Sequence, residues 1–261
     1  MINFSQLNEI QILLFALILL RMSSFVVSAA IFSSAQISHP LKVLIAVVFT
    51  LVVFSPLSSN EVFARIKDHE SDLLTLAGRE VLIGICLGFV TRFFFFAVGM
   101  AGEIVSISMG LGQAQMFNPM MGSMGNAMEQ FYVVIATLVF FTFNGHHVML
   151  QGLVESFQSA PVAQMTFSVA TLGEMVFKMQ EYLIIGIKFA APILISMTIV
   201  QFGIALLSRV VPQINVLVTS ASLTVVLGFI IMFVSLPLLV MQMTSMMNVS
   251  MDDFFKFLKA I

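Results

Sequence analysis

The residues from Ile104 to Met128 read IVSISMGLGQAQMFNPMMGSMGNAM, and they decide the fold class of this chain. These 25 residues between Glu103 and Glu129 hold no charge, and long apolar runs flank them on both sides. The segment is too apolar for a solvated loop and too rich in glycine and proline for a regular spanning helix. Methionine is unbranched and polarizable, so it fills irregular gaps. The pattern therefore predicts a deformable apolar plug built into a membrane protein.

The composition indicates an integral membrane protein. The 261 residues are 59% hydrophobic and 9% charged, with a mean hydropathy of +1.07, whereas soluble domains carry nearer ~25% charged residues. The net charge of -2 gives no indication of nucleic-acid binding. Cys86 is the single cysteine, so it cannot form an internal disulfide. No Lys or Arg precedes the first apolar run, so we expect this run to belong to the mature fold rather than to a signal peptide.

Six apolar segments are candidates for membrane-spanning helices, which need roughly 20 mostly apolar residues. We expect an all-α fold in which these long helices pack in hairpins. Pro192 and Pro237 predict kinks in the fifth and sixth helices. The segments run at about 7–31, 40–54, 73–100, 128–150, 178–207 and 216–246.

Charged residues interrupt these apolar segments. Arg79, Glu80 and Arg92 lie within or at the edge of the third one, and an intramembrane charge costs at least ~2.5 kcal/mol. Such groups persist by pairing or by facing a protein interior, so the pattern predicts helices packed in a larger assembly with polar seams. The motif Gly84-x-x-x-Gly88 either permits close helix approach or reflects chance in a glycine-rich helix. The other interrupting charges are Arg21, Glu103, Glu129, Lys188 and Arg209.

Arg79 and Glu80 are neighbours in sequence, and adjacent helix residues point about 100° apart. They therefore do not pair with each other. We expect each to find a partner on another subunit, the alternative being that they mark the membrane edge of the helix. The C-terminal segment 251–261 is amphipathic and suits a membrane surface or a partner, or equally a solvated helix end.

No pattern of residues indicates catalysis. His146 and His147 could suggest a metal site with Glu155, but adjacent residues cannot aim at one face of a helix. A helix end without a metal is the favoured interpretation. The chain shows no nucleophile–base pair, phosphate loop or cofactor motif, so we expect neither an enzyme nor a cofactor.

Three motifs, in their order and spacing along the chain, resemble those of a known protein family. The run Arg79-Glu80-Val81-Leu82-Ile83-Gly84 is followed by Asn144-Gly145-His146-His147, and later by Arg209-Val210-Val211-Pro212-Gln213-Ile214-Asn215. Together they resemble the FliR family of flagellar export-gate proteins and its virulence-secretion counterpart, SctT. The resemblance covers about Leu73 to Pro237, and the histidine pair leans toward the flagellar branch.

The resemblance implies a subunit of the flagellar type III export gate, in the bacterial inner membrane at the flagellar basal body. In that family, FliP-like and FliQ-like subunits join FliR in the channel for unfolded export substrates, and an FlhB-like export switch protein is a further partner. It implies a FliP-like region over 1–175, a FliQ-like hairpin over 176–250 and a tail over 251–261. The family's hairpins build a shell lifted out of the bilayer, which would account for the charges within apolar helices.

The resemblance also implies which residues act. The loop that plugs the closed channel in the family corresponds to about 104–128. The alternative is a loop packed into the protein's own core. The family's usual acid is replaced here by an asparagine, which removes a charge from the seal, and the segment 219–224 lacks the Pro and Lys of the family's Gly-Phe-Pro-Leu-Lys run. The plug is centred on Met116, Phe117, Asn118, Pro119, Met120 and Met121.

The last hairpin turns at Pro212, which is flanked by Arg209, Gln213 and Asn215. These polar groups either satisfy backbone atoms left open at the turn or contact neighbouring FliQ-like subunits. Three rival readings remain: a virulence export-gate subunit of the SctT type, a membrane scaffold without a pore, and a stand-alone transporter. The transporter would use Glu103, Glu129 and Lys188 as substrate or proton sites.

Overall fold

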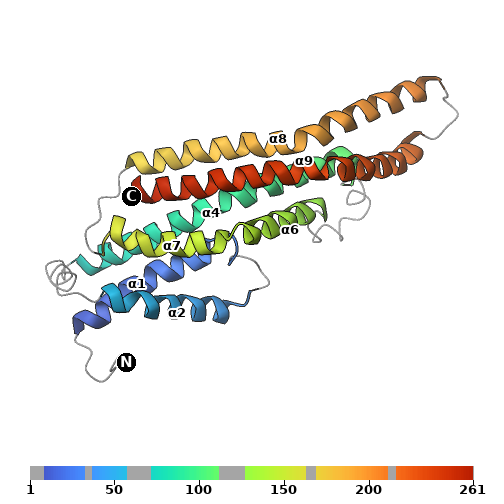
Figure 1. Cartoon of the computed structure of the whole chain (residues 1–261). Helices are drawn as coiled ribbons and strands as arrows, with labels where there is room; N and C mark the ends of the chain where they lie inside the picture. The colour runs from blue at the N-terminus through green and yellow to red at the C-terminus, as the bar shows by residue number, and fades with distance from the viewer. Residues whose placement is uncertain are drawn as a thin grey trace. The chain divides into compact units, whose positions relative to one another are not determined.

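The computed structural model describes residues 9–32, 37–57, 72–111, 127–162, 169–210 and 216–260. Within these ranges the chain forms helices and their connections, and no strand (Figure 1). Five of the helices are long and apolar enough to cross a membrane, or six if the bent pair α6 and α7 forms one span. The predicted all-α membrane fold is therefore confirmed. The helices are α1 (Glu9–Ser28), α2 (His39–Leu57), α4 (Leu73–Met109), α6 (Ala127–Thr142), α7 (Gly145–Ser159), α8 (Val169–Val210) and α9 (Val216–Ala260).

The predicted fourth helix is broken into α6 and α7. Asn144 adopts a left-handed backbone conformation with a φ of 54°, which asparagine tolerates better than most residues. The two helices are bent by 68° at this point. Gly145 follows the break, and a Cβ there would lie 2.5 Å from the Phe140 ring. The expectation of one continuous helix over 128–150 is therefore wrong.

The end of α4 is defined by a capping motif rather than by a change in hydropathy. Gly110 has a φ of 76°, its N–H donates to the Ile107 carbonyl at 3.0 Å, and the Leu111 N–H donates to the Ser106 carbonyl at 3.1 Å. This is the hydrogen-bond pattern of the Schellman motif. The Gln201 side-chain amide donates to the Ser108 carbonyl at 2.8 Å. The cap lets α4 extend to Met109 and satisfies carbonyls that its last turn leaves open.

The chain forms two compact units. Unit 1 contains Met1–Phe93, His146–Val176 and Ser250–Ile261, and unit 2 contains Phe94–Gly145 and Phe177–Val249. The division into 1–175, 176–250 and 251–261 stays a prediction, since unit 2 joins 177–249 to 94–145. The likeness of either part to FliP or FliQ stays a prediction.

The core of unit 1 forms where α1 meets its neighbours. The Phe15 ring of α1 lies edge-on to Phe54 of α2, with 5.8 Å between the ring centroids. The last turns of α9 also belong here, because a Cβ on Gly152 of α7 would lie 2.2 Å from the Phe254 ring. Phe257 and Leu258 are buried as well. Phe254, Phe257 and Leu258 of the C-terminal tail are thus covered by the chain itself.

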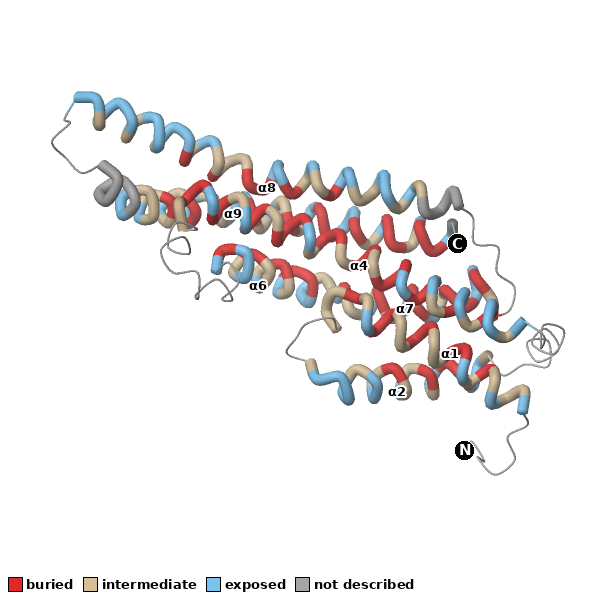
Figure 2. The backbone as a smooth tube through the Cα atoms, turned by 180° about the vertical axis from the view of Figure 1, so that it is seen from behind, coloured by how far each residue is buried: buried red, intermediate tan, exposed pale blue. Residues whose placement is uncertain are grey.

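Unit 2 combines the second half of α4 with α6, α8 and α9. Helices α8 and α9 lie side by side (Figure 1). Small residues let the helices approach α4 closely. A Cβ on Gly186 of α8 would lie 2.7 Å from the Ala97 carbonyl, and one on Gly228 of α9 would lie 2.6 Å from Met109 Cγ. Figure 2 shows exposed residues recurring along α8 and α9, and many of the exposed side chains are large and apolar.

Candidate functional site

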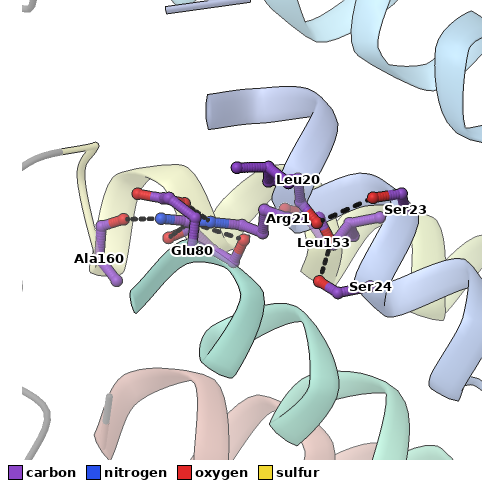
Figure 3. Close-up of polar contacts among 8 residues, drawn as sticks. Leu20, Arg21, Ser23, Ser24, Glu80, Leu153 and Ala160 are labelled. Atoms are coloured by element: carbon purple, nitrogen blue, oxygen red, sulfur yellow. Dashed lines mark hydrogen bonds and ion pairs between the residues drawn. The ribbon is translucent and has the colours of Figure 1, made fainter. Parts of the chain in front are cut away.

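Arg21 is a fully buried cation in the middle of α1, with 0% of its surface exposed. Its Nε donates to Glu80 Oε2 at 2.6 Å, and its Nη1 donates to the Ser156 carbonyl at 3.0 Å and to Ser156 Oγ at 3.2 Å. Its Nη2 donates to the Ala160 carbonyl at 2.9 Å. A single side chain therefore joins α1 to α4 and to the C-terminal end of α7 (Figure 3).

Each partner compensates for taking the guanidinium out of water. The Glu80 carboxylate balances its charge, and Glu80 is itself only 3% exposed. The carbonyls of Ser156 and Ala160 lie at the end of α7, where a cation is favoured by the helix dipole and fills acceptors left open by the helix end. The Phe157 ring lies 4.1 Å from the Arg21 guanidinium carbon, which adds a cation–π contact.

Glycines on α4 bring it close enough to α1 for this cluster to form. A Cβ on Gly84 would lie 1.9 Å from Ser24 Oγ and 2.4 Å from the Arg21 carbonyl. One on Gly88 would lie 1.9 Å from Ser28 Oγ. The structure thus confirms the close-approach reading of the Gly84-x-x-x-Gly88 motif.

Arg92 of α4 caps the C-terminal end of α1. Its Nε donates to the Ser28 carbonyl and its Nη2 donates to the Val27 carbonyl at 3.5 Å. Thr91 Oγ1 accepts a hydrogen bond from the Ala30 N–H at 3.3 Å. Arg92 is thus a half-buried charge inside an apolar helix whose donors meet carbonyls of the neighbouring helix, as expected for a charge that faces protein rather than lipid.

The residues that were predicted to contact other subunits differ in how far they are buried. Arg79 is exposed, but the adjacent Glu80 is buried and pairs with Arg21 of the same chain. The expected partner of Glu80 on another subunit is therefore corrected to a partner within unit 1. Arg209 is exposed in the last turn of α8. Gln213 and Asn215 lie outside the described residues, as do the plug residues Met116 to Met121.

Sequence reasoning flagged Arg21 as an interrupting charge but missed its partners. An isolated arginine in an apolar helix signals a buried counter-charge somewhere in the chain. No local signal points to Ser156 or Ala160, because both contribute backbone carbonyls, which every residue carries. In the described part of the chain, no group of three or more His, Cys, Asp or Glu side chains could hold a metal ion. The donors of Arg21 point at groups of the chain itself, which makes the cluster a structural junction.

Comparison with known proteins places the chain among export proteins. Residues 12–249 match the family described as bacterial export proteins, family 1. The flagellar biosynthetic protein FliR of Aquifex aeolicus is 30% identical over 238 residues, which cover 90% of this chain and 88% of the relative. FliR of Bacillus subtilis is 26% identical over 241 residues, covering 91% and 92%.

A relative from a different system matches a shorter region. Yop proteins translocation protein T of Yersinia pestis is 32% identical over 148 residues, covering 56% of this chain and 57% of the relative. Since the family match runs from residue 12 to residue 249 and the Aquifex relative aligns along almost the whole chain, this all-helical membrane protein belongs to the FliR family of bacterial export proteins.

Proposed function

We propose that this chain is a subunit of the flagellar type III protein export gate in the bacterial inner membrane, at the flagellar basal body. Together with FliP-like and FliQ-like subunits, and beside an FlhB-like switch protein, it forms the channel that unfolded export substrates cross. The observation that carries this proposal is the alignment with flagellar FliR over 90% of the chain.

The length of α9 supports an assembly rather than a helix surrounded by lipid alone. Residues 216–251 carry no charge and are helical throughout. Thirty-six residues at ~1.5 Å each extend over ~54 Å, whereas the hydrocarbon core is only ~30 Å thick. A tilt at the upper end of the usual range, ~40°, still leaves ~40 Å along the membrane normal. Apolar side chains are exposed from Leu223 to Val249, so protein partners are needed to cover part of this surface.

The methionine-rich segment over about 104–128, centred on Met116 to Met121, is proposed as the plug of the closed channel. Methionine and glycine conform around an obstacle, and apolar constrictions exclude water and ions. The helices that enter and leave this segment are packed together in unit 2, because a Cβ on Gly102 of α4 would lie 2.7 Å from Glu129 Cα of α6. Both ends of the segment therefore have a fixed support, which a plug requires if it is to return to one position.

The test is to delete Phe117–Met121 and measure the ion conductance of the purified complex in planar bilayers. We expect the deletion to leave a leak, because the seal loses its apolar centre. Deletion of Val62–Ile66, in the charged segment between α2 and α4, is the control of equal length and should leave the complex closed. If both complexes assemble and conduct equally, the plug assignment is wrong.

A virulence export gate of the SctT type is the second candidate, because the Yersinia pestis translocation protein is 32% identical over 148 residues. The exported proteins distinguish the two systems. Loss of this chain abolishes filament assembly if the gate is flagellar and leaves filaments intact if it serves virulence secretion.

A further inference from the structure

Lys188 is an exposed charge in the middle of the α8–α9 hairpin. It is the single charged residue between Glu181 and Arg209 on α8, and α9 carries none before Asp252. Neither helix of the hairpin therefore carries a carboxylate at the same height along the hairpin as Lys188. Glu181, the nearest acid along α8, is bonded to Lys178 at 2.8 Å.

The side chains that share a face with Lys188 are apolar and exposed. Ile184 lies four residues before it, Ile195 seven after and Ile199 eleven after, which is the spacing of one helix face. They are 46%, 60% and 68% exposed. We call Ile184, Lys188, Ile195 and Ile199 the Lys188 stripe.

Neither water nor lipid suits the whole stripe. Water is a poor solvent for three exposed isoleucines on one helix face, and the hydrocarbon core is a costly place for an ammonium group. A protein surface can cover both, provided that it brings apolar side chains for the isoleucines and an anion for the lysine.

The described carboxylates of unit 2 do not supply that anion. Glu103 of α4 and Glu129 of α6 are exposed, and in the described part of the chain no ion pair joins either of them to Lys188. Within the described ranges, then, no carboxylate forms an ion pair with Lys188.

We propose that the Lys188 stripe is the docking surface for a membrane helix of another subunit, an apolar helix that carries an aspartate or glutamate facing Lys188. This inference rests on the proposed function, since it takes the partner from the membrane subunits of the export gate. The apolar side chains supply contact area, and the charge pair sets the register of the two helices.

The test uses the assembled complex, purified through a tag on this chain. A photo-crosslinking residue at Ile184 should capture one membrane subunit, at a peptide that contains Asp or Glu within about one helical turn. Lys188→Glu should reduce the recovery of that subunit about thirtyfold or more, because it places two like charges face to face. Lys188→Arg should retain it. Lys178→Glu is the matched control, a half-exposed lysine on the same helix, and should leave recovery unchanged because its pair with Glu181 is solvent-accessible and contributes little.

A charge swap decides whether the lost recovery reflects the proposed pair. Lys188→Glu combined with Lys at the crosslinked acid should restore the complex, whereas either change alone should not. Crosslinks only to lipid or to a second copy of this chain, or normal recovery with Lys188→Glu, would overturn the docking surface while leaving the export-gate function standing. If the unchanged chain purifies with no other membrane subunit, the proposed function fails, and this inference fails with it.

Discussion

At the scale of single residues, Arg21 shows how a charge survives inside an apolar helix. Its ion pair with Glu80 spans 59 positions of sequence, and its bond to the Ala160 carbonyl spans 139. A buried pair of this kind is weak evidence for stability by itself, because desolvation offsets most of the attraction. Removing one partner is different, since the other then remains buried without compensation.

Arg21→Leu should therefore lower the free energy of unfolding in detergent by about 3–5 kcal/mol. Arg21→Leu combined with Glu80→Leu should recover much of that loss, because no buried charge remains. Arg21→Lys keeps the charge but not the planar set of donors, so it should fall between the two. Denaturant titration followed by circular dichroism measures all three. A double variant as unstable as Arg21→Leu would contradict the argument.

At the scale of elements, close packing depends on glycines at particular positions of α4. Gly84 and Gly88 face the serines of α1, and Gly102 faces the first turn of α6. Gly78, six residues before Gly84, has nothing within 4 Å of where a Cβ would lie. Glycine therefore permits a close helix contact at Gly84 but makes no contact at Gly78.

This contrast supplies a matched pair of substitutions. Gly84→Ala should destabilise the chain by about 1–3 kcal/mol, because the new Cβ meets the Arg21 carbonyl, which cannot rotate away. Gly78→Ala should instead stabilise it by about 0.5–1 kcal/mol through reduced backbone freedom in the unfolded chain. Thermal unfolding in detergent compares them. Equal shifts in the same direction would show that α1 and α4 do not approach closely at Gly84.

The helices also show where the local sequence pattern no longer predicts the structure. Hydropathy located the apolar segments, but the segment predicted over 128–150 is divided at Asn144 into α6 and α7. The Asn-Gly sequence there is a turn signal, yet whether a helix breaks depends on what the flanking turns pack against. Here Gly145 leaves room for Phe140.

At the scale of the whole molecule, the buried charges that pair within this chain differ from the charges that remain exposed on its surface. Glu80 is buried by its own chain, whereas the adjacent Arg79 is exposed. Arg79→Leu should therefore leave the unfolding free energy of the isolated chain nearly unchanged and abolish co-purification with FliP-like subunits. Quantitative mass spectrometry of the purified complex measures the second effect. Normal recovery of those subunits would show that Arg79 merely marks the edge of the membrane helix.

The sequence alone determined the class of this protein. Hydropathy is summed over neighbouring residues, so it reveals apolar helices without knowledge of their packing. The order of short motifs was enough to suggest the FliR family, and the alignment over most of the chain confirms it. Charges inside apolar segments indicated groups that pair or face a protein interior, as Arg21, Glu80 and Arg92 do, but the partner of Glu80 was expected on another subunit and lies in the same chain.

Which partners they have was decided by the tertiary structure alone. Arg21 meets Glu80 and the end of α7 within unit 1, where Gly84 and Gly88 let α1 and α4 approach closely. The tail at the end of α9 is amphipathic in sequence, but Gly152 of α7 provides the place for Phe254. Hydropathy is a property of neighbours along the chain, whereas the pairing of a buried charge depends on helices that are distant in sequence and meet only in the fold.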